Sequence, residues 1–130
     1  MEFTRRIELD IPYDDAVGRV KAALKEQGFG VLTEIDVRQT LKEKLDVDVA
    51  PQIILGACNP QLAHRALEID PRIATLLPCN VVIRTEHGRT VVEALDPKIL
   101  ADVPGRSDLA PIADEAVQRI QDALDALRSA

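Results

Sequence analysis

The run Ile53-Ile54-Leu55-Gly56-Ala57-Cys58-Asn59-Pro60 decides how the centre of the chain folds. Its first part, Ile53 to Cys58, is apolar at both odd and even positions, which is typical of a strand buried on both faces. Asn59 is a good helix N-cap, and Pro60 suits the first helical position. The run therefore predicts a strand that ends at Cys58 and a helix that begins directly after it.

Downstream of this run, the pattern predicts a helix, a hairpin and a closing helix. We expect the helix from Pro60 to turn Ala63, Ala66 and Leu67 inward. His87-Gly88 makes a tight turn between two alternating stretches, which is typical of a β-hairpin. The expected elements are a helix from Pro60 to about Asp70, strands over 79–86 and 89–95, a loop after Asp96-Pro97, and a helix from Ser107 or Asp108 to Arg128. The closing helix carries an apolar stripe with helical spacing, made of Ile112, Ala113, Ala116, Val117, Ile120, Leu124 and Leu127.

Upstream of the run, two strands and two helices are predicted. Apolar residues alternate with polar ones from Glu2 to Asp10, apart from one charged interruption, and this period is typical of a strand. Gly28 suits the left-handed position that ends a helix. The expected elements are a strand over 2–10, a helix from Asp14 to Gln27, a strand over 31–38 and a short helix over 39–45.

The order of elements is β-α-β-(short α)-β-α-β-β-α, which predicts an α+β fold with a mostly antiparallel sheet backed by helices. The 130 residues are enough to bury a core without disulfides or metals, so we expect a single domain over residues 1–130. With only three aromatic residues, that core must be built from aliphatic side chains.

The composition excludes several classes of partner. Sixteen basic residues against 22 acidic ones give a formal net charge of -6, so the surplus of Lys and Arg that holds proteins to nucleic acid is missing. Three aromatic residues also provide no platform for stacking bases. The sequence contains no apolar run long enough to span a membrane, and its N-terminus does not resemble a signal peptide. We therefore expect a cytoplasmic protein that binds neither nucleic acid nor membrane.

Cys58 and Cys79 are the only cysteines, and in a reducing compartment they are expected to be free thiols. Cys58 precedes the expected helix N-terminus, where unpaired N–H groups and the helix dipole favour a thiolate. Cys79 begins a strand directly after Pro78. If the two strands were parallel, the cysteines would lie at opposite ends of the sheet, whereas an antiparallel arrangement would bring them together. The sequence leaves both arrangements open.

Several roles are open to the two cysteines. Most free cysteines are small buried apolar side chains without a chemical role. A disulfide is disfavoured by the expected compartment. A metal site on Cys58 and Cys79 falls short of the usual four ligands, so His64 or a second copy of the chain would have to complete it. The sequence identifies no cofactor.

Three stretches around the cysteines resemble domain-of-unknown-function family 302. They are Ile54–Pro60, Leu62–Leu67 and Leu77–Ile83, and the pairs Gly28-Phe29, Val31-Leu32, Ile35-Asp36 and Asp96-Pro97 match the same pattern. The characteristic positions of the family correspond to Cys58, Asn59, Pro60, Leu77, Pro78 and Cys79. The resemblance implies a small bacterial-type α/β domain, related in shape to the TATA-box-binding protein, that pairs as a homodimer. It implies no established activity.

Other candidate residues have ordinary structural explanations. His87 lies in the hairpin turn, at a position that demands a positive φ. The carboxylates of the closing helix form a solvated face. Gly28-Phe29-Gly30 lacks the third glycine of a dinucleotide-binding loop.

The sequence is most consistent with a small homodimeric domain, not an enzyme, that binds a ligand or a metal or presents a thiol at one site. The residues of this site are Cys58, Asn59, Pro60, Pro78, Cys79 and Asn80. One alternative is a thiol-dependent redox or sulfur-transfer enzyme, against which the lack of a Cys-x-x-Cys motif argues. The other is a purely structural dimer with inert cysteines.

Overall fold

The alternating stretches pair into one five-stranded sheet with the order β1-β5-β4-β3-β2, in which every neighbouring pair is antiparallel. The structure is a computed structural model and describes residues 2–129. Its elements are β1 (Thr4–Leu9), α1 (Tyr13–Glu26), β2 (Gly30–Asp36), α2 (Val37–Leu45), β3 (Gln52–Cys58), α3 (Pro60–Ile69), η1 (Pro71–Leu76), β4 (Cys79–Glu86), β5 (Arg89–Leu95), α4 (Ile99–Asp102), η2 (Ser107–Leu109) and α5 (Ala110–Ser129).

The predicted α+β class, with an antiparallel sheet backed by helices, is confirmed. Two segments that lie outside the predicted helices and strands form short helices. The 3₁₀ helix η1 begins where Asp70 accepts a hydrogen bond from the Arg72 N–H, with Pro71 at its first position. The four-residue α4 follows Asp96, which accepts a hydrogen bond from the Lys98 N–H. Such single turns are too short to produce a periodic pattern in the sequence.

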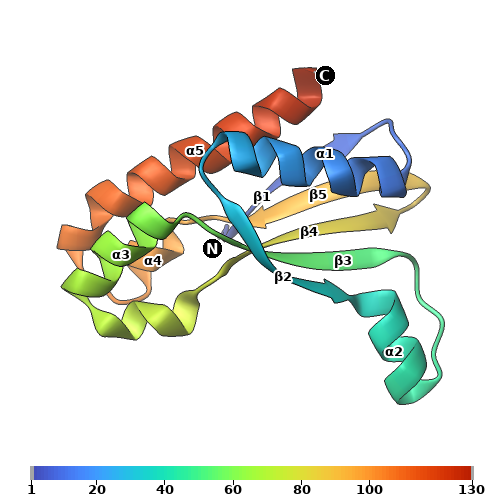
Figure 1. Cartoon of the computed structure of the whole chain (residues 1–130), viewed down its shortest axis with the longest axis horizontal. Coiled ribbons are helices and arrows are strands. Elements are labelled where there is room, and N and C mark those ends of the chain that lie inside the picture. The colour runs from blue at the N-terminus through green and yellow to red at the C-terminus, as the bar shows by residue number, and fades with distance from the viewer. Residues whose placement is uncertain (1, 130) are drawn as a thin grey trace.

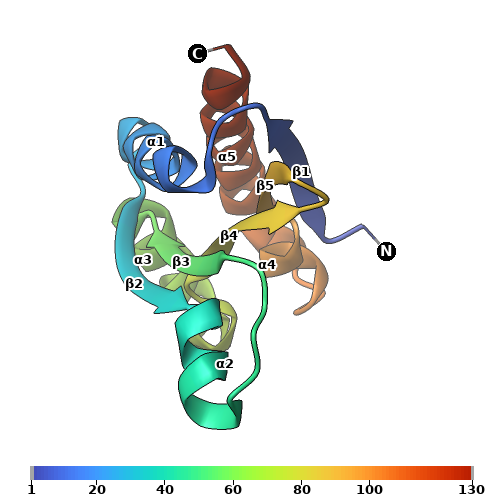
Figure 2. The same ribbon diagram turned by 90° about the vertical axis from the view of Figure 1, so that its right-hand side faces the viewer.

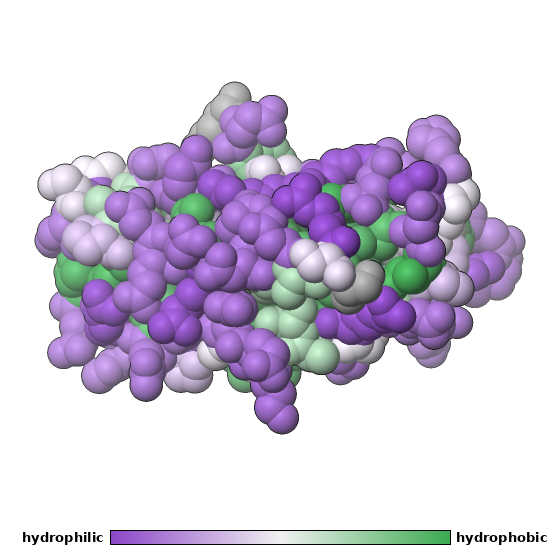
Figure 3. All heavy atoms as spheres, turned by 90° about the horizontal axis from the view of Figure 1, so that it is seen from above, coloured by the Kyte–Doolittle hydropathy of each residue, from purple (hydrophilic) through white to green (hydrophobic). Residues whose placement is uncertain are grey.

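Helices α1 and α5 cover one face of the sheet (Figure 1, Figure 2). The main core lies between them and the strands, and it is aliphatic as expected, with Phe29 as its single buried aromatic among residues 2–129. Of the predicted stripe of α5, Ile120, Leu124 and Leu127 face this core, whereas Ile112 and Ala116 belong to a second apolar cluster. Val117 is only half-buried. The outer surface over these helices is mostly hydrophilic, with scattered apolar residues (Figure 3).

A second apolar cluster lies at one end of the sheet, where α3, η1 and α4 pack against the first turns of α5 (Figure 1). Cys79 belongs to it, and its large buried side chains are Leu62, Ile73, Leu100, Leu109 and Ile112. Of the residues of α3 expected to face inward, Ala66 is buried, while Ala63 and Leu67 are half-buried. This cluster joins distant parts of the chain around the start of β4.

The face of the sheet opposite α1 and α5 carries ion pairs over β1, β5 and β4. Arg84 is the centre of this network, since its guanidinium lies 2.9 Å from both Glu86 and Glu93. Arg6 also contacts Glu86, at 3.4 Å. Beneath these side chains Val91 is fully buried. The charged side chains therefore shield the apolar surface of the central strands from water.

Strand β2 and helix α2 form an arm that extends from the body of the molecule (Figure 1, Figure 2). We use the term β2–α2 arm for residues 30–47. Asp36 caps α2 by accepting a hydrogen bond from the Gln39 N–H, yet no residue of α2 is buried. Leu32, Ile35 and Leu45 of the arm are 67%, 47% and 66% exposed. The arm thus leaves large apolar side chains in contact with solvent.

Asp70 holds together the junction between α3 and η1. Its carboxylate is buried and accepts hydrogen bonds from Arg72 Nε at 3.0 Å and Arg72 Nη2 at 2.7 Å. Arg106 lies 3.9 Å from the same carboxylate and donates a hydrogen bond to the Ile69 carbonyl. The hydrogen bonds from Arg72 lower the pKa of Asp70 from 3.8 to about 2.

We predict that Asp70 makes stability depend on pH in the acid range. Because its pKa is lower in the folded chain than in the unfolded chain, its contribution is complete above about pH 4 and is lost as the pH falls toward about 2. Asp70→Asn should therefore be less stable than the wild type near neutrality, and this difference should shrink over that window. Denaturant unfolding at a series of pH values measures it.

Asp114→Asn is the matched control, because Asp114 is exposed and has no ion-pair partner within the described chain. The free energy of unfolding of Asp114→Asn should stay close to that of the wild type at every pH in this window. A difference for Asp70→Asn that is the same at both ends of the window would contradict the role assigned to this carboxylate.

Candidate functional site

The register of β3 and β4 brings the two cysteines to the same end of the sheet. Ala57 is the direct partner of Cys79, so Cys58 lies one residue beyond that pair. From ordinary strand spacing and rise, the Cα atoms of Cys58 and Cys79 lie about 6 Å apart. This is within the range over which two cysteines can be bridged. Of the two arrangements left open by the sequence, the antiparallel one is therefore correct.

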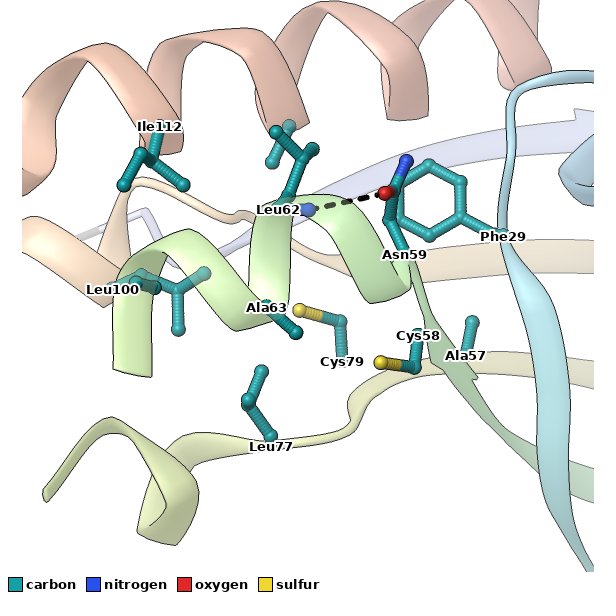
Figure 4. Close-up of a pocket in the computed structure, with 12 residues that line it drawn as sticks. Phe29, Ala57, Cys58, Asn59, Leu62, Ala63, Leu77, Cys79, Leu100 and Ile112 are labelled. Carbon is teal, nitrogen blue, oxygen red and sulfur yellow. Dashed lines mark hydrogen bonds between the residues drawn. The ribbon is translucent and has the colours of Figure 1, made fainter. Parts of the chain in front are cut away.

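A small apolar cavity of about 20 Å³ lies against both cysteines. Figure 4 shows the two sulfur atoms pointing to the same side, toward the space between Ala63 of α3 and Leu77. Phe29 and Leu62 contribute further walls. A cavity of this volume has room for about one water-sized group. Its surface is almost entirely apolar, so sulfur is the only soft donor it offers among the residues that line it.

Burial lowers the acidity of both thiols. Cys58 is half-buried, and loss of solvation raises the pKa of its thiol above the ordinary value. Cys79 is buried more deeply, and burial together with the neighbouring Cys58 raises its pKa to about 11. Burial of Cys58 thus acts against the thiolate that the start of α3 is expected to favour. Both side chains are neutral thiols at physiological pH.

The polar residues next to the cysteines are structural. Asn59 is buried, and its Oδ1 accepts a hydrogen bond from the Leu62 N–H at 3.2 Å, which is the predicted helix cap. Pro60 occupies the exposed first position of α3. Asn80 pairs with Gly56 across the sheet and points to solvent, away from the cavity. Thus Cys58, Cys79 and Asn59 line the cavity, whereas Pro60, Pro78 and Asn80 do not.

His64 does not join the cysteines. Its side chain is 77% exposed on α3, and its Nε2 lies 3.6 Å from Glu68 Oε1. Within residues 2–129, no group of three or more His, Cys, Asp and Glu side chains is arranged to hold a metal ion. The structure therefore does not bring His64 to the two cysteines, because α3 turns this side chain outward.

Several walls of the cavity left no signal in the sequence around the cysteines. Leu100 and Ile112 come from α4 and α5, far along the chain, and reach the cavity through the second apolar cluster. Phe29 follows Gly28, whose φ of +83° confirms the predicted left-handed helix end. The periodicity of α5 indicated that Ile112 faces inward. It did not indicate that Ile112 lines the cavity beside the cysteines.

Gly56 lies where two side chains approach the strand closely. A Cβ atom at this position would lie 2.8 Å from Pro78 Cγ and would also collide with Thr33 Oγ1. Pro78 follows a cis peptide bond and directly precedes Cys79. The absence of a side chain at Gly56 therefore permits the segment that carries Cys79 to pack on β3.

We predict that Gly56→Ala destabilises the chain by about 1–3 kcal/mol, the usual cost of overpacking a filled site. Replacing Thr33 by Ala as well should recover part of this loss, since one of the two collisions disappears. Gly18→Ala is the matched control, because a Cβ there meets no atom within 4 Å. In the middle of α1 this change should stabilise by about 0.5–1 kcal/mol. Equal unfolding midpoints for Gly56→Ala and the wild type would contradict the packing argument.

The chain matches the family model described as "Domain of unknown function DUF302" over residues 5–127. It belongs to this family. The DUF302 chain is also similar to a solved structure, the "Crystal structure of uncharacterized conserved protein DUF302 from Bacillus stearothermophilus". The two share 30% sequence identity, the match covers 98% of this chain and 99% of that one, and the TM-score is 0.91. No curated protein matches the chain. The family resemblance drawn from the residues around Cys58 and Cys79 is confirmed.

Within residues 2–129 no helix is both long enough and apolar enough to cross a membrane.

Proposed function

We propose that this DUF302 chain is a binding protein, not an enzyme, and that its site holds a thiophilic ligand between Cys58 and Cys79. A thiophilic ligand is one that bonds preferentially to sulfur. The observation that supports the proposal is that two thiols from adjacent strands open on one apolar cavity. Two neighbouring thiols bind such a ligand far better than one, because the second bond forms within the same complex.

The acidity of the thiols favours binding over catalysis. A catalytic cysteine needs a thiolate near neutral pH, usually produced by a nearby cation or histidine. Here burial acts in the opposite direction on both cysteines. The residues that line the cavity include no His, Lys, Arg, Asp or Glu that could accept or donate a proton. A thiol-dependent enzyme is therefore the weaker proposal.

A reducing compartment such as the cytoplasm suits this function. Two thiols whose Cα atoms lie about 6 Å apart are close enough to oxidise to a disulfide. In a reducing compartment they remain free, as they are in this structure.

Phenylarsine oxide tests whether the two thiols act together. Its arsenic(III) forms one As–S bond with each of two neighbouring thiols, and the two thiol hydrogens leave with the oxide oxygen as water. We predict one adduct per native chain that survives an excess of a monothiol. Cys58→Ser and Cys79→Ala should each lose this resistance, because a single As–S bond exchanges readily. Mass spectrometry of the intact protein measures the adduct.

Protein unfolded in guanidinium is the control, since its thiols are accessible but no longer held together. If the native chain forms no stable adduct, or if either single variant keeps it, the proposed function is wrong. That result would instead favour a structural domain with inert cysteines.

We also propose that the chain forms a homodimer through the β2–α2 arm. Strand β2 is an edge strand, so one row of its backbone N–H and C=O groups is available for a second copy of the strand. Leu32 and Ile35 on this strand are exposed, and so is Leu45 of α2. The sheet face over β4 and β5, by contrast, is covered by ion pairs. The arm therefore combines an open strand edge with exposed apolar side chains.

Leu32→Glu should convert the dimer to a monomer, because it places a charge in the proposed interface. Val103→Glu is the matched control, since Val103 is 60% exposed on another part of the molecule and should not affect association. Sedimentation velocity measures the mass of each variant. A monomeric wild type would disprove the homodimer, and a dimeric Leu32→Glu would disprove the assignment to the arm.

A further inference from the structure

The cavity at the end of β3 and β4 offers two sulfur donors and very little else. Cys58 and Cys79 line it, whereas the remaining walls are apolar side chains and Asn59, whose Oδ1 already caps α3. His64, the nearest imidazole along the chain, points to solvent. Across residues 2–129 no third His, Cys, Asp or Glu joins the two cysteines. A metal ion bound here by one chain would therefore have only two side-chain ligands, the thiolates of Cys58 and Cys79.

The number and type of donors select among metal ions. Zinc in a structural site takes four ligands, and a pair of cysteines supplies only half of them. Calcium and magnesium require six or more oxygen ligands, which this cavity lacks. Monovalent d¹⁰ ions behave differently, because Cu(I) forms strong bonds to two thiolates in a nearly linear arrangement. Soft sulfur ligands are also the ones that favour Cu(I) over harder ions.

We propose that Cys58 and Cys79 bind one Cu(I) ion per chain, with one Cu–S bond to each cysteine. The proposal rests on the thiophilic site proposed above and names its ligand. The half-buried Cys58 provides the route of entry, and the buried Cys79 holds the inner side of the ion. Leu62, Leu77 and Phe29 form apolar walls of the cavity, so they offer the ion no further ligand.

Binding is coupled to loss of two protons. Each neutral thiol releases one proton as its Cu–S bond forms, so the copper stays Cu(I) and no oxidant or reductant takes part. Because burial keeps both thiols protonated at neutral pH, the metal must displace both protons.

Anaerobic titration of the reduced full chain with Cu(I), in competition with the chromophoric chelator bicinchoninate, tests the proposal. We expect the wild type to withdraw one Cu(I) per chain from the chelator. Cys58→Ser should weaken binding at least about 100-fold, since a single thiolate remains. His64→Ala is the matched control and should bind like the wild type, because that side chain lies outside the cavity.

A second measurement uses only the wild type, so it does not require that any variant folds. X-ray absorption of the wild-type complex should show two sulfur neighbours around copper and no nitrogen or oxygen neighbour. Wild type that fails to compete with the chelator, Cys58→Ser that binds equally well, or one copper shared by two chains with more than two sulfurs would each overturn the proposal.

Failure of this inference and failure of the proposed function are distinguishable. A stable phenylarsine adduct without Cu(I) binding disproves copper as the ligand but leaves the thiophilic site. Loss of both disproves the site itself.

Discussion

Strands β3 and β4 run antiparallel, and the chain between them leaves the sheet at Cys58 and returns at Cys79. Everything at the candidate site depends on this pairing. Because α3 starts where β3 ends, and η1 returns the chain to the same end, the two cysteines are neighbours across the sheet. The same connection places α3 above the sulfur atoms and so closes the cavity. A parallel crossover would have separated the thiols by the whole length of the sheet.

Two opposing effects act on Cys58. The N-terminus of α3 favours a thiolate by about 0.3–1 kcal/mol at an exposed position. Transfer of the sulfur toward an apolar cavity favours the thiol, and this loss of solvation raises the pKa of Cys58. The backbone N–H groups at the helix start are also partly engaged, since the Leu62 N–H already donates to Asn59. The cap that begins the helix thus weakens the electrostatic effect expected from it.

Local features of the fold were predictable from the sequence, whereas contacts between distant segments were not. Asn59 as the cap of α3, Gly28 as the end of α1 and the turn at His87-Gly88 are set by backbone chemistry within a few residues, and the structure confirms them. The strand order depends on which apolar faces pack together across the whole chain, so the distance between Cys58 and Cys79 could not be derived.

The residues that surround the site could not be predicted from the sequence either, because they come from distant segments. Thr33 approaches Gly56 through the pairing of β2 with β3, and Pro78 approaches it through the pairing of β3 with β4. Neither pairing can be derived from the residues next to Gly56. His64 is a plausible ligand by its nearness in sequence to Cys58, yet one turn of helix is enough to direct it to solvent. Leu100 reaches the cavity through a short helix that carries no periodic signal.

If the cavity binds a metal ion as proposed, the acidic surface and the apolar walls would act on cations at different distances. A net charge of -6 attracts cations of every kind, and this attraction extends over about 10 Å in ordinary salt. Within the cavity a hard, strongly hydrated cation loses its water and finds no cluster of oxygen ligands in return, so entry is unfavourable. Only an ion whose bonds to sulfur exceed its loss of hydration gains free energy there. In such a site the two sulfur donors bind soft ions. The apolar walls provide no other ligands, and this lack of ligands excludes hard cations.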